Sequence, residues 1–142
     1  MRMEEDGYNT FYDRQYSSDE GYADKINMQD SPFYDVLIDW LRKNKSWEKK
    51  RFLEIGSGRG ALQDVVNDYT GLDYSSEVKR YYHKSFVNGS ATEMPFADNE
   101  FDVTWSYAVW EHIPDPEKAL EETVRVLKDK GRKRQIIDSI DL

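Results

Sequence analysis

Short apolar runs alternate along this chain with segments whose apolar residues recur at helical spacing. Runs rich in branched and aromatic residues, bounded by turn formers, predict strands at residues 51–55, 69–74, 85–90 and 101–109, with another within 131–142. Helices are predicted within 31–47 and at 61–68, 75–84 and 115–128. This alternation predicts βαβ units, and therefore an α/β fold with a doubly wound, mostly parallel sheet that carries helices on both faces.

Two of the predicted helices have a clear start and an apolar face. Ser31 with Pro32, and Asp115 with Pro116, are typical of a cap followed by the first helical residue. The predicted apolar face of the first helix comprises Phe33, Val36, Leu37, Trp40 and Leu41. That of the last helix comprises Leu120, Val124 and Leu127.

The first predicted strand runs directly into a glycine-rich turn, in FLEIGSGRGA at residues 52–61. Gly56, Gly58 and Ala61 fit the G-x-G-x-x-G/A spacing of nucleotide-binding loops. Asp73 follows Glu54 by nineteen residues, near the roughly 20-residue offset of an acid that binds ribose hydroxyls. The two features predict an adenosine-like ligand, with a helix-capping role for Asp73 as the alternative.

Composition narrows the classes of function. The net charge of −8 argues against nucleic acid as a partner. Cysteine is absent and the histidines are His83 and His112, so neither a disulfide framework nor a metal site is expected. The sequence has neither a membrane span nor the apolar core of a signal peptide, so we expect a soluble, cytoplasmic protein.

Three motifs in order carry a resemblance to a known family. EIGSGRG, GLDYS and EMPFADNEFDVTWSYAVWEHIPDPEKALEETVRVLK resemble the class I S-adenosylmethionine-dependent methyltransferases, and most of all the type 11 group. The resemblance covers about residues 50–131. It implies a Rossmann-like fold, S-adenosylmethionine as cofactor and a small-molecule methyl acceptor.

The resemblance also implies which residues bind the cofactor. Glu54 would hold the methionine amino end, the glycine loop the carboxypropyl and ribose portion, and Asp73 the ribose. The implied cofactor-binding residues are Glu54, Gly56, Ser57, Gly58, Gly60, Asp73, Tyr74, Ala91, Thr92, Ser106 and Tyr107. At Ser90 the family usually has an Asp that accepts from the adenine amino group, so a serine there implies weaker binding.

Methyl transfer depends mainly on aligning the acceptor, the methyl group and the sulfur. A general base is needed only if the acceptor must lose a proton. Glu111 and His112 follow the fourth predicted strand and are the candidates for that role, with structural roles as the alternative.

The two ends of the chain differ from the central motifs. Residues 1–30 are acidic and rich in aromatics, among them Tyr8, Phe11, Tyr12 and Tyr16. We expect this segment to be either a lid over the cofactor or a tail. Residues 31–142 would form the cofactor-binding domain, with about five of the family's usual seven strands. The family's proline–glycine–glycine turn is replaced by LKDKGRKRQ, so we expect a domain that is incomplete at its C-terminus.

Methyl transfer from S-adenosylmethionine to a small molecule is therefore the expected function. The alternatives are the nucleotide-binding domain of an NAD-dependent oxidoreductase and a non-catalytic binding module with a truncated methyltransferase fold. The sequence leaves the acceptor, its reacting atom and the oligomeric state undetermined.

Overall fold

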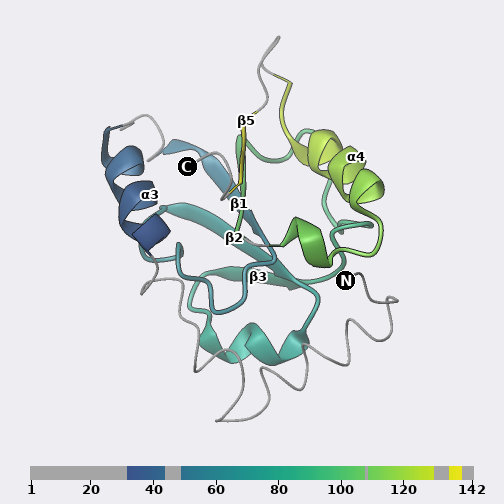
Figure 1. Cartoon of the computed structure of the whole chain (residues 1–142), viewed down its shortest axis with the longest axis horizontal. Helices are drawn as coiled ribbons and strands as arrows, with labels where there is room; N and C mark the ends of the chain where they lie inside the picture. The colour runs from purple at the N-terminus through teal and green to yellow at the C-terminus, as the bar shows by residue number, and fades with distance from the viewer. Residues whose placement is uncertain (1–31, 44–48, 108, 130–134, 139–142) are drawn as a thin grey trace.

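The computed structural model describes residues 32–43, 49–107, 109–129 and 135–138 (Figure 1). The strands are β1 (Arg51–Ile55), β2 (Asp68–Asp73), β3 (Ser85–Asn88), β4 (Val103–Ser106) and β5 (Gln135–Asp138). The α-helices are α3 (Pro32–Lys43) and α4 (Pro116–Val126), and the short 3-10 helices are η3 (Ser76–Tyr81) and η4 (Trp110–His112). The predicted N-terminal lid, residues 1–30, lies outside the described residues.

The strands form one sheet in the order β3-β2-β1-β4-β5, and every pairing within it is parallel. The predicted fold class is confirmed. The chain winds outward from β1 to β3 on one side and then from β4 to β5 on the other. This reversal of strand order between β1 and β4 opens a crevice at the carboxyl ends of the strands, where ligands bind in such folds.

Each face of the sheet buries its own apolar cluster, because successive side chains of a strand point to opposite faces. Phe52 of β1 and Trp105 of β4 pack with Leu37 and Leu41 of α3. Leu53 and its neighbours on the other face pack with Ala119 and Val126 of α4, and with Met94, Phe101, Val109 and Ile113. Figure 1 shows α3 and α4 on opposite sides of the sheet.

The prediction of a helix at residues 61–68 is wrong. Residues 58–65 form a succession of turns, with Gly60 N donating to Ser57 O and Gln63 N donating to Gly60 O. Only residues 56–67 connect β1 to β2, near the minimum of about a dozen for a parallel crossover. The glycine turn uses the first part of that length, so too little remains for a full helix. Leu62 and Val66 are nevertheless buried, which explains the helix-like apolar spacing.

The predicted apolar faces of α3 and α4 are also partly wrong. Val36 and Leu120 are 48% and 49% exposed. In α4 the buried residues are Ala119, Thr123 and Val126. Small side chains at the first two of these positions let the helix lie close to the sheet, and this turns Leu120 towards solvent.

Arg125 of α4 holds the loop that leads from β3 to β4. Its guanidinium donates to the carbonyls of Met94 and Phe96 and to Asp98 Oδ1, at 2.9, 2.8 and 2.8 Å. Its Nε donates to Glu122 Oε2 at 2.6 Å, and this charged hydrogen bond lowers the pKa of Glu122. The loop is thereby fixed against α4.

Among the described helices, none is long and apolar enough to span a bilayer.

Candidate functional site

The glycine turn after β1 has a backbone that only glycine adopts readily. Gly56, Gly58 and Gly60 have φ angles of 64°, 51° and 69°. Residues other than glycine are strained in this left-handed region of backbone conformation. The chain therefore turns sharply at the carboxyl end of β1, beside the point where the strand order reverses.

The structure shows what approaches two of these glycines. A Cβ atom on Gly56 would lie 2.5 Å from Cγ2 of Val109, in the segment after β4. A Cβ atom on Gly60 would lie 2.6 Å from Cε1 of Tyr82, which follows η3. At both positions the absence of a side chain makes room for the protein's own residues. This need for glycine holds whether or not the turn also binds a ligand.

Asp73, at the end of β2, ties the glycine turn to the neighbouring strand. Its Oδ2 accepts from Gly58 N at 2.8 Å and its Oδ1 accepts from Ser75 N at 3.0 Å. Ser75 in turn caps η3 by accepting from Glu77 N. Asp73 is 8% exposed and lines the cavity described next. A carboxylate oxygen has two lone pairs, so Asp73 can support the turn and still accept from a ligand.

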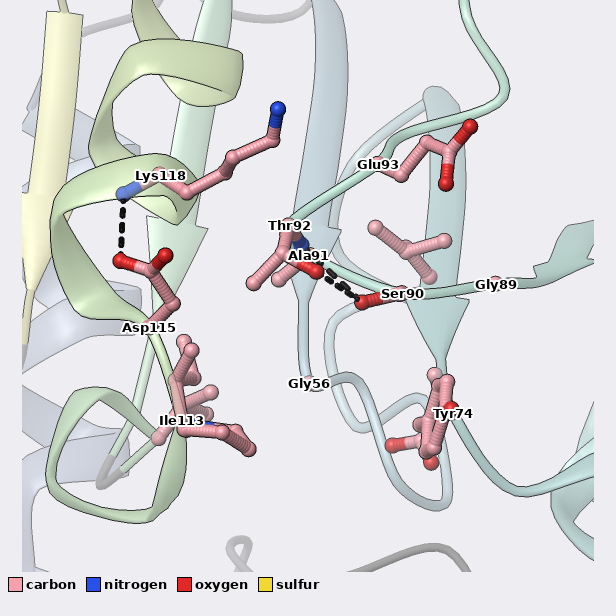
Figure 2. Close-up of a pocket in the computed structure, with 14 residues that line it drawn as sticks. Gly56, Tyr74, Gly89, Ser90, Ala91, Thr92, Glu93, Ile113, Asp115 and Lys118 are labelled. Carbon is pink, nitrogen blue, oxygen red and sulfur yellow. Dashed lines mark hydrogen bonds between the residues drawn. The ribbon is translucent and has the colours of Figure 1, made fainter. Parts of the chain in front are cut away.

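A cavity of about 230 Å³ lies beyond the carboxyl ends of β1 and β2. In Figure 2 one wall comes from Tyr74 and residues 89–93, and the opposite wall from the segment that leads into α4. Its lining residues are Gly56, Leu72, Asp73, Tyr74, Gly89, Ser90, Ala91, Thr92, Glu93, Val109, Ile113, Pro114, Asp115 and Lys118. Pockets for drug-sized ligands start at about 300 Å³, so this one suits a nucleoside-sized portion of a larger ligand.

The wall at residues 90–93 is a tight polar turn. Ser90 Oγ lies 2.7 Å from Thr92 Oγ1 and accepts from Thr92 N at 3.1 Å. Glu93 N donates to Ser90 O at 3.2 Å. Figure 2 shows this turn facing Asp115 and Lys118 across the cavity. Asp115 Oδ1 accepts from Lys118 N at 3.1 Å and caps α4.

Glu54 lies two residues before the glycine turn and Ser57 lies within it, but neither residue lines the cavity. Glu54 is 3% exposed, and its Oε1 accepts from Tyr69 OH at 2.6 Å. Burial raises the pKa of Glu54 to about 8; the hydrogen bond from Tyr69 opposes the shift and the charge of Asp73 adds to it. Ser57 Oγ accepts from Tyr82 OH at 2.5 Å.

Of the predicted cofactor-binding residues, the cavity brings together Gly56, Asp73, Tyr74, Ala91 and Thr92. The cavity lining lacks the other six, which are Glu54, Ser57, Gly58, Gly60, Ser106 and Tyr107. The binding roles predicted for all eleven residues stay predictions. Ser106 is buried, and its Oγ accepts from Trp110 Nε1 at 2.8 Å. Tyr107 packs against the cluster on the α3 face.

Glu111 and His112 belong to η4 and lie outside the cavity lining. Their carboxylate and imidazole are 3.9 Å apart, with side chains 60% and 41% exposed. A role as general base therefore stays a prediction for both.

Sequence reasoning missed the wall that carries Val109, Ile113, Pro114, Asp115 and Lys118. The Asp-Pro helix start was the available signal, because a helix that follows a strand of a parallel sheet begins at the same edge as the ligand crevice. Nothing in the sequence pattern pointed to Lys118.

A parallel sheet with this strand order, a glycine turn after β1 and an acid at the end of β2 define a Rossmann-like fold. Within that class, the chain belongs to the type 11 methyltransferases, because the family model described as "Methyltransferase domain" matches residues 53–133. The resemblance inferred from the sequence motifs is confirmed.

Individual relatives agree with this family. A demethylmenaquinone methyltransferase of Renibacterium salmoninarum is 32% identical over an alignment 125 residues long, which covers 72% of this chain and 52% of the relative. The chain thus spans about half the length of such curated relatives.

Solved structures show the same fold. The protein mmp1179 of Methanococcus maripaludis aligns with a TM-score of 0.63 at 21% identity, over 73% of this chain and 56% of that one. A SAM-dependent methyltransferase of Aquifex aeolicus aligns with a TM-score of 0.56 at 23% identity, over 75% and 67%.

Proposed function

We propose that this chain binds S-adenosylmethionine and contributes to methyl transfer to a small-molecule acceptor. The observation that carries the proposal is the cavity itself. The chain belongs to a methyltransferase family, and its cavity is lined by the acid at the end of β2, a polar turn after β3 and an apolar wall before α4. That is the mixture of flat apolar surface and a few fixed polar groups that an adenosine requires.

The residues present fit the adenosine end of that cofactor. Two backbone N–H groups already hold the Asp73 side chain in place. Binding ribose hydroxyls therefore costs this side chain little further conformational entropy. Leu72, Val109 and Ile113 supply apolar surface for a purine, and Tyr74 supplies an aromatic ring. The bound cofactor would supply an activated methyl group on a positive sulfur. The protein's part is then to hold the cofactor and exclude water.

The family and its relatives support a class of acceptor. The Renibacterium relative is named as a demethylmenaquinone methyltransferase. We therefore propose a small organic acceptor. Glu111 and His112 remain our candidates for a base if the acceptor carries a proton that must leave, because both side chains are accessible.

Ser90 gives a direct test of how the cavity is occupied. Its Oγ already accepts from Thr92 N and shares a hydrogen bond with Thr92 Oγ1, so little accepting capacity is left for an adenine amino group. Ser90→Asp keeps the acceptor for Thr92 N and adds a charged one. We expect S-adenosylhomocysteine to bind about 10-fold more tightly to this variant, as a charge-assisted hydrogen bond adds about 1.4 kcal/mol.

Two controls isolate that hydrogen bond. Ser90→Asn adds an acceptor without charge and should give a smaller gain. S-inosylhomocysteine has a carbonyl in place of the amino group and should gain nothing from Ser90→Asp. Equilibrium binding of both ligands to the three proteins measures this. An equal gain for the two ligands, or no gain for either, would show that the purine amino group does not face Ser90.

A further inference from the structure

Tyr82, in the segment after η3, inserts its ring between the glycine turn and β2. A Cβ atom on Gly60 of the turn would lie 2.6 Å from Cε1 of Tyr82, and one on Gly71 of β2 would lie 2.7 Å from the same atom. The ring also packs on Phe86 of β3 and Tyr69 of β2, with centroids 4.7 and 6.4 Å away. Two glycines therefore make the space for this ring, and neighbouring aromatic rings hold it there.

This packing places the Tyr82 hydroxyl against the glycine turn. The hydroxyl lies 2.7 Å from Gly58 O and 2.5 Å from Ser57 Oγ. A hydroxyl has one hydrogen and two lone pairs, so Tyr82 donates to one of these oxygens at a time and can accept from Ser57 while it donates to Gly58 O. Burial raises the pKa of Tyr82, so the hydroxyl keeps its hydrogen at neutral pH.

Gly58 connects Tyr82 to the cavity. Its carbonyl accepts from Tyr82, and its N–H donates to Asp73 Oδ2 at 2.8 Å. Asp73 lines the cavity, whereas Tyr82 does not. A buried carboxylate takes the position that its donors fix, so a shift of Gly58 moves the Asp73 carboxylate with it. The Tyr82 hydroxyl is therefore one residue removed from a group that a ligand can meet.

A second set of hydrogen bonds joins the same two segments without reaching Gly58. Gln63 is 3% exposed; its Nε2 donates to Tyr81 O at 3.0 Å, and its Oε1 accepts from His83 N at 3.0 Å. These bonds hold the segment after η3 against the turns that follow the glycines. Their loss would loosen the support of the glycine turn in general, so Gln63 offers a comparison for effects of stability alone.

We propose that Tyr82 is a positioning residue for the ribose-binding carboxylate: its hydroxyl fixes Gly58, and Gly58 holds Asp73 in the orientation that accepts from ribose hydroxyls. The inference rests on the proposed function, in which Asp73 binds the ribose of an adenosine-bearing ligand. Tyr82 itself touches no ligand. Removal of its hydroxyl therefore weakens the part of binding that depends on the ribose hydroxyls and spares the rest.

The preference for a ligand with ribose hydroxyls measures this coupling. S-adenosylhomocysteine and its 2′,3′-dideoxy analogue differ in those hydroxyls alone, so the ratio of their dissociation constants isolates the contact. Calorimetric titration of the whole wild-type chain should show a preference for S-adenosylhomocysteine of about 10-fold or more, as expected of a charged acceptor. In Tyr82→Phe the ring remains, and the preference should shrink by about 5-fold, the effect of one neutral hydrogen bond.

Two further variants separate positioning from loss of stability. Gln63→Met removes buried hydrogen bonds between the same segments and keeps the Tyr82 hydroxyl, so it should lower the midpoint of denaturant unfolding and retain the wild-type preference. Tyr82→4-aminophenylalanine supplies a donor in place of the hydroxyl and should also retain the preference. This last variant still tests the proposal if Tyr82→Phe does not fold.

The outcomes have different meanings. An unchanged preference in Tyr82→Phe, an equal decrease in Gln63→Met, or a lost preference in folded Tyr82→4-aminophenylalanine would overturn the role of Tyr82 and leave the proposed function standing. Equal binding of the two ligands to the wild type would also overturn it, because Asp73 would then not meet the ribose. Absence of S-adenosylhomocysteine binding would contradict the proposed function and this inference together.

Discussion

Replacing Asp73 with Ala is expected to weaken both the fold and ligand binding. The variant leaves two buried backbone donors, Gly58 N and Ser75 N, without their acceptor. At about 1–3 kcal/mol for each buried donor left unsatisfied, the free energy of unfolding should fall by about 2–6 kcal/mol. Loss of the charged acceptor for ribose should cost about another 1.5–3 kcal/mol of binding, a factor of about 10 to 150.

Denaturant unfolding and titration with S-adenosylhomocysteine measure the two effects separately. Asp68→Ala is the matched control, because Asp68 begins the same strand at its opposite end and is exposed. It should change the free energy of unfolding by no more than about 0.5 kcal/mol and leave binding unaffected. Lost stability with unchanged affinity would mean that Asp73 supports the turn alone. If neither quantity changed, the hydrogen bonds at both oxygens would be without consequence.

Gly56→Ala is expected to be at least as damaging to the fold. Gly56 has a φ of 64°, which costs a residue with a Cβ about 1–2 kcal/mol. The new Cβ would also lie 2.5 and 2.8 Å from the two γ carbons of Val109, and overpacking of this kind costs about 1–3 kcal/mol. The free energy of unfolding should therefore fall by about 2–5 kcal/mol.

A double-mutant cycle with Val109→Ala divides this loss into its two causes. Removal of the Val109 γ carbons should relieve the overlap and leave the backbone strain, so the two substitutions should couple favourably by about 1 kcal/mol or more. Gly89→Ala is the control. Gly89 also lines the cavity, but its φ is not positive and its added Cβ would approach no closer than 3.1 Å. A stability of Gly56→Ala within about 0.5 kcal/mol of the wild type would contradict the tight contact.

Much of the fold was predictable because strands β1, β2 and β3 are local features of sequence. Each is a short apolar run that ends at a glycine or a polar turn, and alternation with helices is enough to imply a parallel sheet. The helix predicted at residues 61–68 failed for a reason that is not local. Leu62 and Val66 have helical spacing, but the short connection between β1 and β2 decides how they are buried.

The candidate site was predictable where the chain itself fixes the geometry. Gly56 and Asp73 end adjacent parallel strands, so their proximity follows from the order of the motifs. The opposite wall depends on how the segment after β4 folds back over Gly56, which places Val109 and Ile113 in the cavity. Likewise, the hydrogen bond between Tyr69 and Glu54 depends on strand register, and sequence spacing does not reveal it.

The proposal that this cavity holds S-adenosylmethionine is tested most directly by comparing two ligands. Calorimetry of the purified chain should show S-adenosylhomocysteine binding at one site and no heat from NAD at the same concentration. The binding should be weakened in Asp73→Ala and tightened in Ser90→Asp. Tighter binding of NAD than of S-adenosylhomocysteine, weakened in the same Asp73 variant, would contradict the account and identify the cavity as a dinucleotide site.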